Sequence, residues 1–216
     1  MNGAAAPKAR ATEVAYYAIE ALIATLQLKP GQAIVEHDLA LATGLGRTPI
    51  RESLMRLVAC GLIEQEPRRG MRVSEIRVDQ HLVLIDTRRV LEQMIAAGAA
   101  RWASPDQRAL ALEHTQKMIS AARQGDLYLY MQADRALDHT NYEACRNPFA
   151  VTAVEPMVVQ CRRFWYAYQY EGDMEQSAAC HAMLAEGVAA GNTEQALQGV
   201  NALMDYMTLF ARKVIG

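Results

Sequence analysis

The sequence predicts a mainly α protein, with an N-terminal helix-turn-helix that ends in a small β-ribbon and a C-terminal antiparallel bundle of about six helices. Aromatic residues make up only 6% of the chain, while Ala, Leu and Met are abundant, and this composition favours helices over sheets. Residues 39–58 (LALATGLGRTPIRESLMRLV) place a glycine-bearing turn between two short helical patterns. From Asp79 onward helical patterns follow one another, without the alternation typical of strands.

The expected elements of the N-terminal part are short and are separated by turn residues. Thr12 can cap the first long helix, and Gly61 can end the last helix before the ribbon. In chain order we expect a disordered tail over residues 1–10, a helix from Thr12 to about residue 26, a very short strand within 28–35, a helix over 36–42, a turn over 43–46, a helix from Arg47 or Thr48 to residue 61, and a two-stranded ribbon over 62–76.

The C-terminal part predicts helices whose ends coincide with Pro, Gly, Asn or Asp residues. We expect these helices over residues 79–103, 105–123, 126–146, 148–170, 174–190 and 193–214. Because the links between them are short, consecutive helices should pack as antiparallel neighbours. The sequence therefore predicts an N-terminal domain over residues 11–77 and an all-helical domain over residues 78–216.

The formal net charge of −2 excludes a uniformly basic nucleic-acid binder, but the charge is uneven. Residues 1–78 hold ten Lys or Arg and eight Asp or Glu (net +2), and residues 79–216 hold the other twelve and sixteen (net −4). This difference favours DNA contact by the first part. No Cys-x-x-Cys motif, signal-peptide core or membrane-length apolar run is present, so we expect a reduced, soluble, cytoplasmic protein.

The predicted helix at residues 47–61 begins with basic and hydroxyl side chains. Arg47 and Arg51 are four residues apart and therefore share a helix face, where each guanidinium can bind a guanine edge or a phosphate. Thr48 can donate to a phosphate, and the amides at a helix N-terminus attract phosphate oxygens. The alternative is a solvated arginine face, and for Arg56, further along the helix, both interpretations are equally supported.

The tip of the predicted ribbon adds two more basic residues. Arg68 and Arg69 can reach an adjacent groove or the DNA backbone, and Gly70 lets the chain approach closely. With these residues in place, the stretch LKPGQAIVEHDLALATGLGRTPIRESLMRLVACGLIEQEPRRGMRV (28–73) resembles the winged helix-turn-helix of the GntR family of bacterial transcription regulators. The matching motifs are PG, GLGRTPIRESL, GLI and RRG.

The resemblance also implies where DNA is contacted. The DNA-contacting positions of the family fall here on His37, Gly46, Arg47, Thr48, Arg51 and Gly70. Gly46 stands where a serine or threonine is common, so one phosphate-contacting hydroxyl is missing. His37 stands where some members have arginine, so we expect a weaker and more pH-dependent contact there.

The helical part resembles the FCD effector domain of the FadR subgroup of that family. The resemblance rests on RRVLEQMIAAGAA (88–100), DRALDHTNYEACRNP (134–148) and HAMLAEGVAAGNTEQAL (181–197). It implies a homodimer whose helical domain binds a small carboxylate metabolite. Members of the family often hold a divalent metal in that pocket through one aspartate and three histidines.

Only part of that metal-binding pattern is kept. The aspartate of the family falls on Asp134 and one histidine on His181, whereas Asp138 replaces a second histidine and Leu203 the last. Asp134 and Asp138 share a helix face, so a site for Mn, Mg, Zn or Ni would have two oxygen ligands and one nitrogen ligand, and would be weaker for Zn²⁺ or Ni²⁺ than a three-histidine site. The alternative is that the carboxylates pair with arginine or cap a helix and that His181 is an ordinary core histidine.

Arg88 interrupts an apolar helix stripe, and a buried arginine needs an anion. In the resembling family an arginine at this position helps to hold the effector carboxylate. We therefore expect Arg88, Asp134, Asp138 and His181 to line the effector site. The alternative for Arg88 is an internal salt bridge, for example to Asp134 or Asp138.

Three functions follow from these observations. The leading hypothesis is a dimeric, ligand-responsive transcription factor that represses from a pseudo-palindromic operator. The second is a metal-dependent hydrolytic enzyme around Asp134, Asp138 and His181, although the sequence contains no nucleophile–base pair or phosphate loop, so we expect no enzymatic activity. The third is an architectural DNA-binding protein with a purely structural bundle, which the incomplete metal pattern favours.

Overall fold

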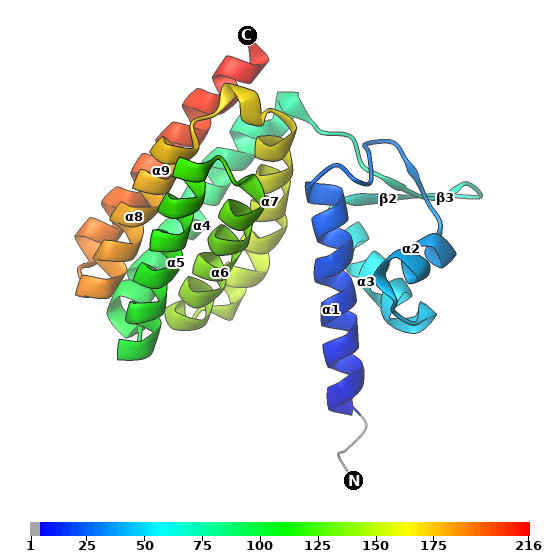
Figure 1. Cartoon of the computed structure of the whole chain (residues 1–216), viewed down its shortest axis with the longest axis horizontal. Helices are drawn as coiled ribbons and strands as arrows, with labels where there is room; N and C mark the ends of the chain where they lie inside the picture. The colour runs from blue at the N-terminus through cyan, green and yellow to red at the C-terminus, as the bar shows by residue number, and fades with distance from the viewer. Residues whose placement is uncertain (1–4) are drawn as a thin grey trace. The chain divides into compact units, whose positions relative to one another are not determined.

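The computed structural model describes the backbone of residues 5–216 and the side chains from Ala11 onward. Over this range the chain forms helices α1–α9, one short 3-10 helix (η1) and one three-stranded sheet (Figure 1). Two compact units are present. One contains the chain up to Arg77 together with Val159–Ala167, and the other contains Val78–Val158 and Tyr168–Gly216. No described helix combines the length and the apolar character that a bilayer-crossing segment requires.

The first unit has the elements of a winged helix-turn-helix. They are α1 (Ala5–Ala24), β1 (Ala33–Ile34), α2 (Glu36–Thr43), α3 (Arg47–Ala59), β2 (Ile63–Glu66) and β3 (Gly70–Val73). The turn between α2 and α3 opens at Gly44, whose φ of 69° is a left-handed conformation that glycine adopts without strain. The antiparallel sheet has the order β1-β3-β2, with Ile63 opposite Val73 and Ala33 opposite Arg72.

Two details of this unit differ from the sequence predictions. The first helix begins at Ala5 rather than at Thr12, so residues 5–10 of the predicted disordered tail are helical, and residues 1–4 lie outside the described residues. Pro7 does not prevent this, because it falls in the first turn, where a helix tolerates proline. The predicted two-stranded ribbon is joined by β1, which makes it a three-stranded sheet.

Apolar side chains from α1, α2, α3 and the sheet form the core of the first unit. Its most buried members are Ile19, Ile23, Leu39, Ile50, Leu54, Leu57, Leu62 and Val73. Polar contacts at the edge of this core fix α3 against α1. The Thr12 hydroxyl donates to Glu52 at 2.7 Å, and the Ser53 hydroxyl lies 2.9 Å from the Thr12 carbonyl oxygen. The two helices are therefore held at one position along each other.

The C-terminal helices confirm the predicted series. They are α4 (Val78–Trp102), α5 (Pro105–Gln124), α6 (Leu127–Cys145), α7 (Pro148–Ala167), α8 (Met174–Ala190) and α9 (Thr193–Ile215), with η1 (Gln169–Glu171) between α7 and α8. The largest difference is at α7, which ends at Ala167 and not at residue 170, because the chain tightens there into η1. The last part of α7 belongs to the first unit, which the predicted domain boundaries did not include.

Local chemistry explains why these helices begin and end where they do. Ser104 forms a capping box with Gln107 at the start of α5. Asp126, Asp173 and Asn192 cap α6, α8 and α9 in a similar way, each accepting from an amide three residues on. These are the residues at which the sequence placed the breaks.

Two glycines allow α8 and α9 to pack backbone against backbone. A Cβ atom on Gly187 would lie 2.3 Å from the Ala196 amide nitrogen, and one on Gly199 would lie 2.3 Å from the Leu184 amide nitrogen. Both contacts are with backbone atoms, which cannot move as the end of a flexible side chain can. The small side of each helix therefore sets the spacing of the pair.

We predict that Gly187→Ala lowers the free energy of unfolding of the helical domain by about 1–3 kcal/mol, because the clash with Ala196 outweighs the better helix propensity of alanine. Gln198→Ala, at an exposed position of α9, is the matched control and should change stability by less than about 0.5 kcal/mol. Urea unfolding followed by circular dichroism measures both. Equal midpoints for Gly187→Ala and the unsubstituted protein would show that the helices can separate without cost.

Candidate nucleic-acid interface and effector site

The first turn of α3 presents the basic and hydroxyl side chains that the sequence singled out. Arg47, Thr48 and Arg51 are all exposed, while Ile50 and Leu54 on the opposite face are fully buried. Gly46 precedes the helix in an extended conformation and provides no side-chain cap. The N-terminal amides of α3 therefore lie beside exposed guanidinium groups, which is the arrangement that attracts a phosphate.

Arg51 has a partner that sequence reasoning missed. Its Nε and Nη2 atoms both donate to the Glu36 carboxylate at 3.1 Å, and its side chain is 71% exposed. The two residues are fifteen positions apart and meet because the turn after α2 brings the start of that helix against α3. No spacing rule within one helix could have identified this pair. Such an exposed pair contributes about 0–1 kcal/mol, so the guanidinium can exchange partners.

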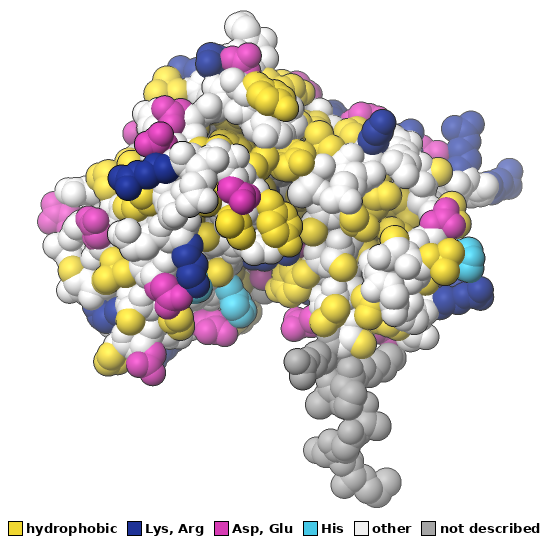
Figure 2. All heavy atoms as spheres, viewed as in Figure 1, with side chains coloured by type: hydrophobic (Ala, Val, Ile, Leu, Met, Phe, Trp, Pro, Cys, Tyr) yellow, Lys and Arg dark blue, Asp and Glu magenta, His cyan; other side chains and the backbone are white. Residues whose placement is uncertain are grey.

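The tip of the β2–β3 ribbon is basic and exposed. Arg68 and Gly70 have positive φ values of 67° and 88°, which form the tight turn at the tip. Arg69 is loosely paired with Glu66 at 3.8 Å and its side chain is 82% exposed. Figure 2 shows Lys and Arg side chains gathered at the end of this ribbon and near α2. The positive charge of the first unit is thus concentrated at the ribbon tip and at the start of α3.

Two other residues of the predicted DNA-binding surface have different surroundings. His37 is exposed on α2, as a side chain that contacts a groove would be. The guanidinium of Arg56 lies 4.2 Å from the centre of the Tyr16 ring, in a cation–π contact with α1. This contact favours the structural interpretation of Arg56.

Arg88 is buried in the helical domain, as its place in an apolar stripe predicted. It forms a salt bridge with Glu92, with Nε and Nη2 both 2.9 Å from the same carboxylate oxygen, and Nη1 lies 3.4 Å from the Met207 sulfur. An internal salt bridge was the alternative that the sequence left open, but Glu92 was not among the partners suggested for it. This partner is four residues further along the same helix, a spacing that the sequence itself shows.

His81 is a second buried group near Arg88 that sequence reasoning missed. Burial and the positive charge of Arg88 lower the pKa of His81 to about 4. At neutral pH this histidine is therefore uncharged, and the positive charge of that region belongs to Arg88. An imidazole one turn from the start of a long helix gave no signal of burial beyond the apolar residues around it.

Asp134 and His181 are brought together from α6 and α8. The His181 Nε2 atom lies 3.2 Å from an Asp134 oxygen, and its Nδ1 atom lies 2.8 Å from the Ser177 carbonyl oxygen. Burial alone lowers the pKa of His181, but the hydrogen bond and charge of Asp134, with the Ser177 carbonyl, outweigh burial and raise the pKa above its usual value. A protonated imidazole suits this position because both ring nitrogens face oxygen atoms.

The predicted three-ligand metal site does not form around this pair. Within the described residues, no three His, Cys, Asp or Glu side chains lie close enough to hold one metal ion, so Asp138 does not complete a site with Asp134 and His181. Asp138 is buried on α6, and Leu203 on α9, where the family pattern expects the last histidine, is also buried. Zinc sites in proteins use three or four protein ligands. The residues present therefore do not fit the metal that the family often holds.

Sequence comparison gives matches to two families over most of the chain. Residues 83–206 match the FCD domain, and residues 11–73 match the bacterial regulatory proteins of the gntR family. Among curated relatives, a 133-residue segment is 28% identical to the HTH-type transcriptional regulator McbR of Escherichia coli K12, and covers 62% of this chain and 60% of McbR. A 61-residue segment is 41% identical to an HTH-type transcriptional regulator of Streptomyces ambofaciens, and covers 28% of this chain and 26% of that protein. The chain thus spans less than two thirds of the length of these two relatives.

Solved structures confirm the arrangement of the elements. The structure of E. coli McbR/YncC matches with a TM-score of 0.81 at 20% identity, and covers 95% of this chain and 99% of that chain. A GntR-type regulator from Rhodococcus sp. RHA1 matches with a TM-score of 0.69 at 20% identity, and covers 96% and 99%. At this identity the structures establish the fold. With the exposed basic start of α3 and the matches to both families, the chain belongs to the FCD-domain family of GntR-type proteins, which are DNA-binding transcription regulators and not enzymes.

Proposed function

We propose that this chain is a homodimeric repressor that binds a pseudo-palindromic operator and is released or retuned by a small carboxylate metabolite. The observation that carries the DNA-binding part is the exposure of Arg47, Thr48 and Arg51 on the first turn of a helix whose other face is buried. A dimer would present two such helices to successive half-sites, which is why we expect the operator to be pseudo-palindromic.

The start of α3 suits the major groove of DNA. Arg47 and Arg51 can each form two hydrogen bonds with the O6 and N7 atoms of a guanine, and Thr48 can donate to a phosphate. Arg51 can do so only by leaving Glu36. The cost is small because the pair is solvent-exposed, and the negative charge of the DNA favours the exchange. Glu36 would then orient Arg51 before binding, without a strong hold on it.

The ribbon tip supplies contacts to the DNA backbone or the adjacent groove. Arg68 and Arg69 extend from the turn that contains Gly70, and a Cβ atom added to this glycine would have no neighbour within 4 Å. The backbone there can therefore lie close to a ligand. His37 on α2 would add a weaker contact that strengthens when the imidazole is protonated.

The effector part of the proposal is supported by the buried charges of the helical domain. Arg88, with its planar guanidinium, can bind a carboxylate through two parallel hydrogen bonds. The uncharged His81 nearby adds no competing charge, and the Asp134–His181 pair supplies polar groups on α6 and α8. An effector carboxylate would share or replace the Glu92 contact of Arg88. No metal is included, because the donor set does not fit one.

The repressor assignment is supported by a relative. A 177-residue segment is 23% identical to a probable D-xylose utilization operon transcriptional repressor of Paenarthrobacter nicotinovorans, and covers 81% of this chain and 76% of that protein. An architectural DNA-binding protein with a ligand-independent bundle is the alternative. A thermal-shift screen of small organic acids distinguishes the two, since only a sensing domain gains stability from a ligand.

We predict that Arg47→Ala and Arg51→Ala each weaken operator binding by about 1–3 kcal/mol and relax the base preference. Gel shifts on the promoter beside the encoding gene, against scrambled DNA of equal length, measure both effects. Arg101→Ala, an exposed arginine on α4, is the control for a simple loss of charge. Unchanged affinity in both α3 variants would remove these residues from the DNA-binding surface.

The role of Arg88 requires a design that separates ligand binding from folding. Arg88→Gln alone leaves Glu92 buried without its cation, which is costly, so the double variant Arg88→Gln/Glu92→Gln is compared with Glu92→Gln. We predict that Glu92→Gln keeps the thermal shift produced by an active acid and that the double variant loses it. An equal shift in both would show that the arginine makes no contact with the effector.

We predict that the helical domain loses stability as pH falls from about 6.5 to 4 because of His81. The unfolded chain binds this proton near pH 6.5, and the folded chain only near its lowered pKa of about 4, so acid favours unfolding by at most about 3 kcal/mol. His81→Gln should unfold with a flatter pH profile. Urea midpoints at pH 7, 6 and 5 measure the difference, and parallel profiles for the two proteins would contradict the assignment.

A further inference from the structure

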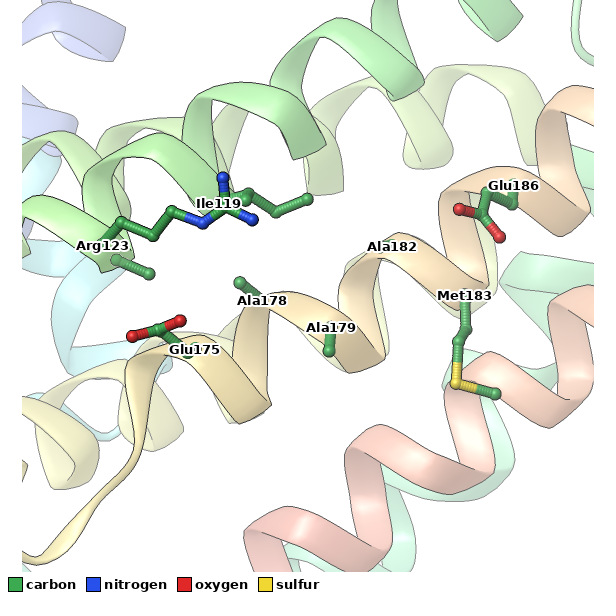
Figure 3. Close-up of a pocket in the computed structure, with 9 residues that line it drawn as sticks. Ile119, Arg123, Glu175, Ala178, Ala179, Ala182, Met183 and Glu186 are labelled. Atoms are coloured by element: carbon green, nitrogen blue, oxygen red, sulfur yellow. The ribbon is translucent and has the colours of Figure 1, made fainter.

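A groove between α5 and α8 is outside the proposed effector site. Its volume is about 360 Å³, and its floor is formed by the small side chains Ala178 and Ala182 (Figure 3). Ile119 and Met183 add larger apolar surface, and Met183 is 42% exposed. Small side chains let a second helix approach closely, so the groove can hold the face of another helix.

The charges of the groove are arranged by end. Arg123, at the end of α5, faces Glu175, at the start of α8, and Glu186 lies toward the other end (Figure 3). Glu186 follows Glu175 by eleven residues, or about 16 Å along the helix. In the part of the chain whose side chains are described, none of these three residues forms a salt bridge. The groove therefore has a positive group at one end and a negative group at the other.

We propose that this groove is the surface on which two copies of the chain dimerise. A two-fold axis through its centre, perpendicular to the helices, would place α8 of each copy over α5 of the other. The same rotation exchanges the two ends of the groove. Arg123 would then meet Glu186 of the partner subunit, and the contact would occur twice.

Self-complementarity of charge and shape identifies the occupant as a second copy. An unrelated partner would need its own acid and base at the same separation, whereas a second copy supplies them by symmetry. The inference rests on the proposed function only in that a homodimer is expected there, and the sequence did not identify its face.

The test uses the full-length chain and complementary charge reversals. Arg123→Glu places two acids opposite each other, and Glu186→Arg places two arginines opposite each other, so each variant alone should dissociate at least about tenfold more readily in sedimentation velocity. Arg101→Glu on α4 and Glu194→Arg on α9, both exposed, are the matched controls and should remain dimeric.

An equimolar mixture of the two groove variants should recover the dimer. In the mixed species one contact joins the acid introduced at position 123 to the base introduced at position 186. The other contact keeps the native pairing of Arg123 with Glu186. Both contacts therefore join opposite charges, as they do in the unsubstituted dimer.

Each outcome decides the proposal. Recovery in the mixture, with the controls unaffected, supports the groove as the interface. Dimers that are unchanged in both single variants, dissociation of either control, or a mixture that stays monomeric would overturn it. Operator gel shifts of the unsubstituted protein are measured separately, so a protein that dimerises through the groove without binding DNA would contradict the proposed function and leave the interface standing.

Discussion

The fold of the first unit depends on the burial of one face of α3. Ile50, Leu54 and Leu57 are fully buried in the core that α3 shares with α1 and the sheet. Because side chains three and four residues apart share a helix face, burial of this stripe fixes which side chains point outward. Arg47 and Arg51 are outside because the stripe is inside. The same helix therefore stabilises the domain and presents the groups proposed to contact DNA.

The two arginines with proposed roles are held by carboxylates in different surroundings. Arg51 is 71% exposed and its partner Glu36 is 32% exposed, whereas the Arg88 and Glu92 side chains are 6% and 9% exposed. An exposed pair is weak and exchanges readily, but a buried pair that loses one member leaves an uncompensated charge. DNA can therefore displace Glu36 at little cost. A metabolite at Arg88 must satisfy both Arg88 and Glu92, which restricts the effector to ligands with additional hydrogen-bond donors.

The sequence predicted the elements whose signals are local. The caps at Ser104, Asp126, Asp173 and Asn192 lie within three residues of the amides that they bind, so the starts of α5, α6, α8 and α9 could be placed to within one residue. The pairing of β1 with β3 could not be predicted in this way. It joins Ala33 to Arg72, and two-residue strands carry no periodicity. The candidate sites show the same division, because the Glu36–Arg51 and Asp134–His181 contacts join separate helices and became visible only in the fold. The Arg88–Glu92 contact was available from its spacing of four residues, but the family pattern pointed to α6 instead.

The Asp134–His181 pair explains how these residues are accommodated in a domain that lacks the family's remaining metal ligands. Both side chains are buried, and each alone would be a polar group removed from water. The imidazolium supplies the positive charge that the carboxylate requires, and the second ring nitrogen of His181 is directed at the Ser177 carbonyl oxygen. With Leu203 buried on α9, the site has the chemistry of a polar contact between helices, which fits an effector bound by hydrogen bonds and ion pairs.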